Sequence, residues 1–265
     1  MLRTDRSSDS QTFLLSKVPH VTLTFWIVKI FATTVGETGG DALSMTLKLG
    51  YLVSTLIFLA FFVVTLAAQV FSKKYHPLFY WAVVVATTTV GTTTSDYLDR
   101  TLGLGYIKSS IMLFCMVLAV LAAWHFSTGK IEFERITTRK EEIFYWVTIL
   151  VSNTLGTALG DFIATTTGLG FEKGALVFAG LIGVVAALHY FTDIPDSVLF
   201  WSAYVLTRPL GATLGDTLTK PYPEGGLGLG RITCSLVMAA AMIVIVAWTW
   251  WRDKSSTQYP EPSTP

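Results

Sequence analysis

WIVKIFATTVGETGGD, residues 26–41, is the first of four related segments in this chain. The other three are WAVVVATTTVGTTTSD at 81–96, WVTILVSNTLGTALGD at 146–161 and WSAYVLTRPLGATLGD at 201–216. Each has a Trp, nine further residues, a Gly, three residues, a small residue and an Asp. The aspartates are 55, 65 and 55 residues apart, which indicates a pair of repeats that has been duplicated.

Each segment is long enough to form a helix that crosses most of a membrane. Fifteen residues of α-helix rise roughly 22 Å and return to nearly the same face. The Trp is then expected at one membrane interface, and the Asp most of the way across a hydrocarbon core about 30 Å thick. Gly50, Gly105 and Gly170 follow nine residues after an Asp, and Gly230 follows after 14. A long apolar run begins after each Gly, so every repeat is predicted to be helix, turn, helix.

The composition places the chain among membrane proteins. Of its 265 residues, 52% are hydrophobic and 14% are charged, against about 25% charged in a soluble domain. The mean hydropathy is +0.55. We predict an all-α membrane protein with eight transmembrane helices, arranged as four parallel two-helix repeats in duplicated halves. Because each repeat has two spans, all four enter the membrane from the same side, and their pseudo-symmetry axis is expected along the membrane normal.

The chain is expected to divide at its polar segments. These are a disordered N-terminal tail (1–17), a first half (18–126), a charged cytoplasmic linker (127–142), a second half (143–251) and a disordered C-terminal tail (252–265). The termini and the links between repeats carry eleven Lys and Arg, and the turns inside the repeats carry six. This excess places both termini in the cytoplasm.

The carboxylates of the repeats are the candidate functional residues. An acid inside a membrane normally faces the bundle interior or a wet cavity, and it has a partner there. Oxygen ligands from several helices suit protons or hard cations such as Mn²⁺. Glu37 and Asp41 are four residues apart, so both lie on one helical face. The predicted cation-binding and metal-binding set is Glu37, Asp41, Asp96, Asp161 and Asp216.

The same residues have structural interpretations. Lys29 and Arg208 are candidate counter-charges that would turn the acids into an ion-pair network. The repeat glycines begin small-xxx-small motifs, which allow close helix packing, and the tryptophans mark the repeat and an interfacial aromatic belt. These packing residues are Gly36, Gly91, Gly156, Gly211, Trp26, Trp81, Trp146 and Trp201. Asp99 and Arg100 are interpreted as an exposed pair at a turn.

Enzymatic chemistry has no support in the sequence. There is no phosphate-binding Gly-rich loop, no HExxH motif and no Ser/His/Asp arrangement that can be placed together. We therefore expect no enzyme activity and no cofactor. The lack of a basic patch argues against nucleic acid as a partner. The expected partners are the lipid bilayer, a divalent metal ion and protons.

The four copies, each with its Trp and a following T-x-G-x(4)-D-like segment, resemble a family of bacterial inner-membrane proteins built from a tandem repeat of unknown function. The resemblance covers about residues 18–251. It implies an eight-helix integral protein of the bacterial inner membrane and carries no established substrate. The fourth repeat departs from the pattern by an insertion and by Arg208-Pro209, and only the first has a carboxylate directly after its Gly.

Three functions remain open from the sequence. The leading hypothesis is a transporter, more specifically a proton-coupled exporter of a hard divalent cation such as Mn²⁺. The second is a structural or sensory membrane component in which Gly-Asp turns pack the bundle. The third is a transporter of a small organic solute, in which the Thr-rich segments and Arg208 hold an anionic group.

Overall fold

The computed structural model describes residues 19, 21–72, 75–129, 131, 136 and 138–258, without the side chains of 253–258. The predicted N-terminal tail (1–17), residues 259–265 of the predicted C-terminal tail, and residues 130, 132–135 and 137 of the charged linker lie outside the described residues. The described part is all-helical and contains no strand.

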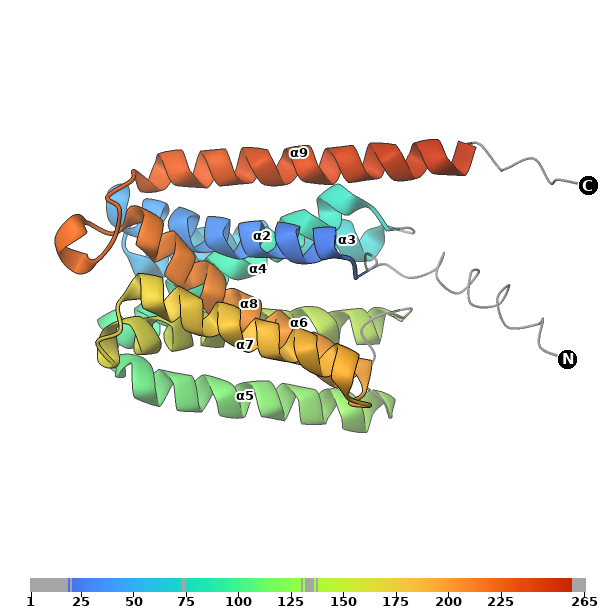
Figure 1. The fold of residues 1–265 in the computed structure, drawn as a ribbon, viewed down its shortest axis with the longest axis horizontal. Coiled ribbons are helices and arrows are strands. Elements are labelled where there is room, and N and C mark those ends of the chain that lie inside the picture. Colours follow the sequence, from blue (N-terminus) through green and yellow to red (C-terminus); the bar gives the residue numbers. More distant parts are fainter. Residues whose placement is uncertain are drawn as a thin grey trace, which may run out of the picture.

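Each repeat consists of a first helix, a short turn and a second helix (Figure 1). The first helices are α2 (Leu23–Asp41), α4 (Pro77–Asp96), α6 (Arg139–Asp161) and α8 (Asp196–Thr219). The second helices are α3 (Tyr51–Phe71), α5 (Gly105–Thr128), α7 (Phe171–Phe191) and α9 (Arg231–Gln258). Three turns begin with one turn of π-helix, and the fourth contains a 3₁₀ turn: η1 (Ala42–Thr46), η2 (Tyr97–Thr101), η3 (Phe162–Thr166) and η4 (Tyr222–Glu224).

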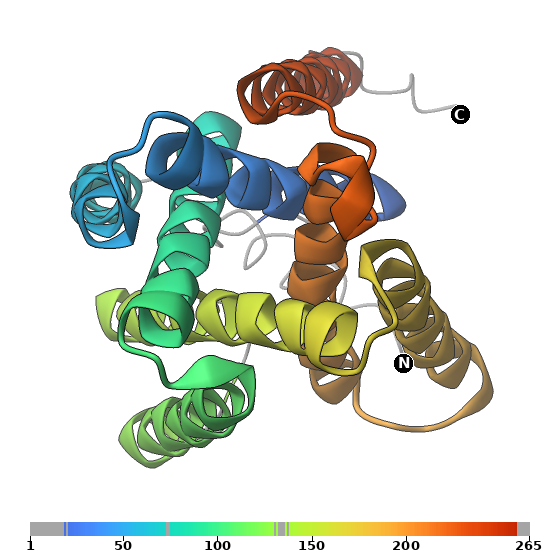
Figure 2. The same ribbon diagram turned by 90° about the vertical axis from the view of Figure 1, so that its left-hand side faces the viewer.

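The four first helices form a closed ring. α2 contacts α4, α4 contacts α6, α6 contacts α8, and α8 contacts α2 again (Figure 2). The second helices lie outside the ring, and each packs mainly against the first helix of the following repeat: α3 on α4, α5 on α6, α7 on α8, and α9 on α2. The four turns gather at one end of the bundle (Figure 1). Because α9 packs on α2 and α5 packs on α6, each half of the chain supplies an outer helix to the other half.

Glycines set the close approach of the ring helices. The repeat Gly on one helix lies against a residue of the next ring helix, seven positions after that helix's Trp. A Cβ added at any of the four would come within 3.0 Å of that neighbour. The pairs are Gly36 with Thr88, Gly91 with Asn153, Gly156 with Arg208, and Gly211 with Thr33. One packing rule therefore recurs four times around the ring.

The turns reverse the chain at residues with positive φ. Gly50, Gly105 and Gly170, nine residues after their aspartates, have φ of 75°, 71° and 79°. This conformation is readily available to glycine and costly for other residues, which explains the glycine at the start of α3, α5 and α7.

In the described part of the chain, five helical segments are long and apolar enough to cross a membrane. They are Tyr51–Phe71, Gly105–Thr128, Arg139–Thr166, Phe171–Phe191 and Arg231–Arg252, which include all four outer helices. Large apolar side chains on the outer helices are exposed, as expected for a surface that faces lipid. Of the ring helices, α2, α4 and α8 fall short of this apolarity, because their buried faces carry Thr, Gly and charged residues.

Two helix ends differ from the sequence-based boundaries. α6 begins at Arg139, inside the predicted linker, because Thr138 and Glu141 form a reciprocal capping box. The same linker contributes Ile136, which is 2% exposed and belongs to the main hydrophobic cluster. α9 continues through 252–258, a segment predicted to be part of the disordered tail.

Candidate functional site

The five predicted carboxylates lie in the half of the ring nearest the turns. Each repeat Asp ends or nearly ends its ring helix, and Glu37 lies one turn earlier on α2. All five are at most 3% exposed. Glu37, Asp41 and Asp216 each offer one carboxylate oxygen within 4.8 Å of the others. Hard cations prefer such oxygen sets, so these three residues fit a divalent metal by ligand type.

Two of the aspartates share a lysine. The Nζ of Lys220 lies 3.5 Å from Asp41 Oδ2 and 3.4 Å from Asp216 Oδ1. Arg231, at the start of α9, adds its Nε at 3.3 Å from Asp41 Oδ2. Burial of the Lys220 ammonium opposes its charge, but Asp216 and Asp41 outweigh that effect and raise the pKa of Lys220 above its ordinary value. Lys220 therefore stays charged and forms ion pairs with both carboxylates.

The other two aspartates share an arginine. Arg100, in the turn η2, places Nε 3.0 Å from Asp96 Oδ1 and Nη2 3.5 Å from Asp161 Oδ2. The sequence suggested that Asp99 and Arg100 form an exposed pair, and this prediction is wrong. Asp99 is 6% exposed and accepts hydrogen bonds from Ser95 and Ser109, because η2 turns its carboxylate inward. The four aspartates thus form two bridged pairs and not one unpaired ring.

Arg208 joins all four ring helices at one point. Its Nη2 lies on α8 and donates to Glu37 Oε2 on α2 at 2.9 Å. The same nitrogen is 2.5 Å from Thr92 Oγ1 on α4 and 2.6 Å from Thr157 Oγ1 on α6. Glu37, Thr92 and Thr157 all stand eleven residues after their repeat Trp, so equivalent positions converge on Arg208. Arg208 is a counter-charge, as the sequence analysis suggested, and the acid that it pairs with is Glu37.

Lys29 lies apart from the carboxylates. It is 0% exposed, and its Nζ lies 4.1 Å from the ring centroid of Tyr204. No hydrogen-bond acceptor among the described residues meets this ammonium. Lys29 therefore does not act as the counter-charge of an aspartate, contrary to the prediction of the sequence analysis.

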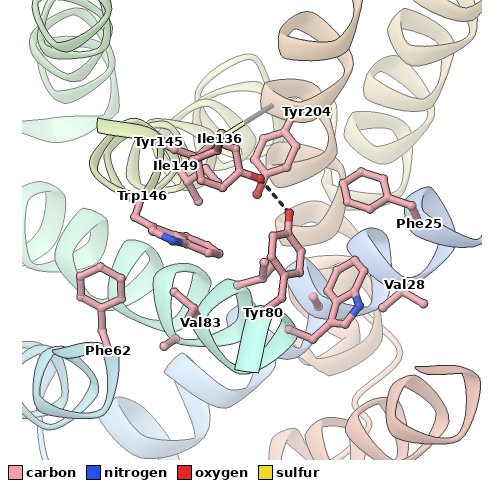
Figure 3. Packing of buried hydrophobic residues seen from close by; sticks show 14 of the residues in the cluster. Phe25, Val28, Phe62, Tyr80, Val83, Ile136, Tyr145, Trp146, Ile149 and Tyr204 are labelled. Carbon is pink, nitrogen blue, oxygen red and sulfur yellow. Dashed lines mark hydrogen bonds between the residues drawn. The ribbon is translucent and has the colours of Figure 1, made fainter. Parts of the chain in front are cut away.

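An aromatic layer fills the end of the ring opposite the turns. The aromatic residue before each Trp contacts the Trp of the next repeat: Phe25 with Trp81, Tyr80 with Trp146, Tyr145 with Trp201, and Phe200 with Trp26. The hydroxyls of Tyr80 and Tyr145 are hydrogen-bonded at 2.8 Å, with Tyr204 beside them (Figure 3). Trp81 and Trp146 are 5% and 1% exposed, because they pack into the ring and do not face a lipid–water interface.

Comparison with known families agrees with the repeat. Four segments, 24–75, 79–130, 144–194 and 199–255, match the family described as Repeat of Unknown Function (DUF347). The chain belongs to the DUF347 family. No curated protein matches it, and no solved structure matches it.

The DUF347 repeat is a sequence unit whose two helices separate in space. Each matched segment contains a first helix and the second helix that follows it. In the bundle, that second helix leaves its own first helix and packs on the neighbour. One DUF347 repeat therefore cannot bury its own apolar surface, and the family unit requires its neighbours to fold.

Sequence reasoning missed three basic residues of this site: Arg100, Lys220 and Arg231. A signal was present for two of them. Arg100 follows Asp96 by four residues and Lys220 follows Asp216 by four, which is the spacing of a helical ion pair. Arg231 had no local signal, since its contact with Asp41 joins residues 190 positions apart.

Proposed function

We propose that this DUF347 protein is a transporter of the bacterial inner membrane, and that its cargo is a hard divalent cation such as Mn²⁺. The single observation that carries the proposal is the buried group of Glu37, Asp41 and Asp216, with ligand oxygens within 4.8 Å of one another. Three carboxylate oxygens from two neighbouring helices suit a hard divalent ion better than a soft one. Protons are the proposed counter-ion, because the same carboxylates bind them.

The membrane arrangement supports a pathway along the ring. The five apolar segments span the bilayer, and the more polar ring helices α2, α4 and α8 complete eight spans behind them. The pseudo-symmetry axis of the parallel repeats then follows the membrane normal, with both termini in the cytoplasm. The proposed pathway runs between the aromatic layer near the tryptophans and the ion pairs at the turns.

The ion pairs suggest how the site exchanges its occupant. Lys220 neutralises Asp41 and Asp216 as a divalent ion would. It follows the last residue of α8, so its side chain can leave the carboxylates without unwinding the helix. An arriving cation would displace the Lys220 ammonium, and Lys220 would return when the cation departs. Lys220 is then an internal competitor that weakens cation binding and permits release.

The test is Mn²⁺ binding by the purified protein, measured by calorimetry, together with Mn²⁺ flux in proteoliposomes. Asp41→Asn should lower affinity by more than tenfold and reduce flux, because it removes a charged ligand. Lys220→Gln should raise affinity and slow release, because it removes the competitor. Asp193→Asn is the matched control, since Asp193 lies exposed in the link before α8. Unchanged binding and flux in both Asp41→Asn and Asp216→Asn would reject the cation site.

A structural role is the second candidate, and one specific observation favours it. Every carboxylate of the site already has a basic partner within 3.5 Å. Paired charges of this kind can have a purely structural role, in which they join helices and bind no ion. This role predicts no saturable Mn²⁺ binding in the wild type, and folding losses in the Asp variants that their partner substitutions reverse.

A further inference from the structure

The centre of the ring holds two basic side chains with unused hydrogen-bond donors. Lys29 on α2 and Arg208 on α8 are both 0% exposed. The Nζ of Lys29 has no hydrogen-bond partner among the described residues, and neither do Nε and Nη1 of Arg208. Only Nη2 of Arg208 is engaged, at the junction with Glu37. Buried donors normally find an acceptor, so these three nitrogens call for one.

The two side chains belong to the same contact between α2 and α8. Lys29 Nζ stands over the ring of Tyr204, and Arg208 follows Tyr204 by one helical turn. The Tyr204 hydroxyl is also buried, and it has no hydrogen-bond partner in the part of the chain that the structure describes. A hydrogen bond from Thr33 Oγ1 to the carbonyl of Thr207, at 3.2 Å, holds the two helices together at this level.

The local charges do not balance. Glu37 neutralises Arg208, but no acid among the described residues pairs with Lys29. The four repeat aspartates are engaged by basic residues of the turns. Burying a cation without a counter-charge is unfavourable, and the cation–π contact with Tyr204 offsets only part of the lost solvation free energy. A water molecule would satisfy the donors without supplying negative charge.

We propose that Lys29 and Arg208 together bind a small monovalent anion, such as chloride, at the middle of the ring. The anion would accept from the Lys29 ammonium and from the free Arg208 donors, and it would supply the missing charge. A small ion is chosen because both side chains are completely buried. This site is separate from the carboxylate group near the turns, and it does not depend on the cation transport proposed above.

The experiment measures anion binding to the purified wild-type protein in detergent. The probes are chloride, bromide, nitrate and formate, added to a buffer whose only other anion is gluconate, which is too large for the site. We expect saturable stabilisation against heat by the small anions. Lys29→Met should weaken apparent chloride affinity by at least tenfold, whereas Lys29→Arg, which keeps the charge, should retain most of it. Lys220→Gln should leave chloride binding unchanged, because Lys220 belongs to the carboxylate site.

A crystallographic experiment covers the case in which the variants fail to fold. Bromide bound to the wild-type protein should give an anomalous signal between Lys29 and Arg208. Absence of saturable stabilisation, equal chloride binding by Lys29→Met and wild type, or bromide found only elsewhere would each overturn the proposal. Mn²⁺ binding is measured separately, so loss of either site is seen independently of the other.

Discussion

At the scale of single residues, Arg208 is the side chain on which the ring converges. It occupies the position of Thr33, Thr88 and Asn153 in the other repeats, so a cation replaces a small polar group in one repeat of four. Glu37 is the matching exception on α2, at a position that is Thr in the next two repeats. The two exceptions meet at 2.9 Å. The two residues that break the fourfold pattern therefore carry opposite charges and pair with each other.

A double-mutant cycle tests this pair. Arg208→Leu leaves the Glu37 carboxylate buried without its partner, and should cost about 3–5 kcal/mol of stability. Glu37→Gln combined with Arg208→Leu removes both charges, so the double variant should lose clearly less than the sum of the single variants. Thermal unfolding in detergent provides the measurement. Simple additivity would mean that Glu37 and Arg208 do not stabilise each other.

At the scale of helices, the glycine contacts explain how such polar helices pack. The Thr hydroxyls of α4 donate mostly to carbonyls three or four residues earlier on the same helix, which satisfies them inside the bundle. The repeat glycines then let the neighbouring backbone approach. At Gly91 the nearest neighbour is main chain, because an added Cβ would lie 2.9 Å from the carbonyl carbon of Asn153.

Gly91→Ala should therefore destabilise the protein by about 1–3 kcal/mol, since the backbone of α6 cannot move away without disturbing the ring. Gly183→Ala on α7 is the matched control. A Cβ there would meet nothing within 4 Å, so this change should be neutral or stabilise the helix by up to about 1 kcal/mol. The comparison is made by thermal unfolding of both purified variants. Similar effects from the two changes would show that ring packing does not depend on Gly91.

At the scale of the whole molecule, closure of the ring depends on the last helix. α9 packs on α2, and Ser235 Oγ lies 2.8 Å from Thr38 Oγ1, although the two residues are 197 positions apart. The alternative, in which every second helix packs on its own first helix, would place α9 on α8. A covalent link between positions 38 and 235 distinguishes the two arrangements.

Thr38→Cys with Ser235→Cys, in a background where Cys115 and Cys234 are replaced by Ser, should form a disulfide in the membrane. A protease site engineered at 130–135 then allows the halves to be cut apart. After cleavage they should migrate together on a non-reducing gel and separate on reduction. Thr38→Cys with Gly183→Cys is the control, which should not cross-link. Halves that separate without reductant would contradict the closure of the ring by α9.

The sequence by itself determined the repeat, the helix–turn–helix unit and the membrane character of the chain. These properties are local, because they depend on the spacing of Trp, Gly and Asp and on the apolar runs between turns. It also placed the four repeat aspartates at equivalent positions, with Glu37 one turn before Asp41. Their spacing could not show that Lys220 and Arg100 divide the aspartates into two bridged pairs.

Only the tertiary structure decided which helices are neighbours and which charges meet. The exchange of outer helices around the ring and the contact of Arg231 with Asp41 join residues far apart in the chain. Such contacts depend on how the buried surfaces of all four repeats fit together, and no single repeat contains that information. The convergence of Glu37, Thr92 and Thr157 on Arg208, and the isolation of Lys29, follow from the closed ring for the same reason.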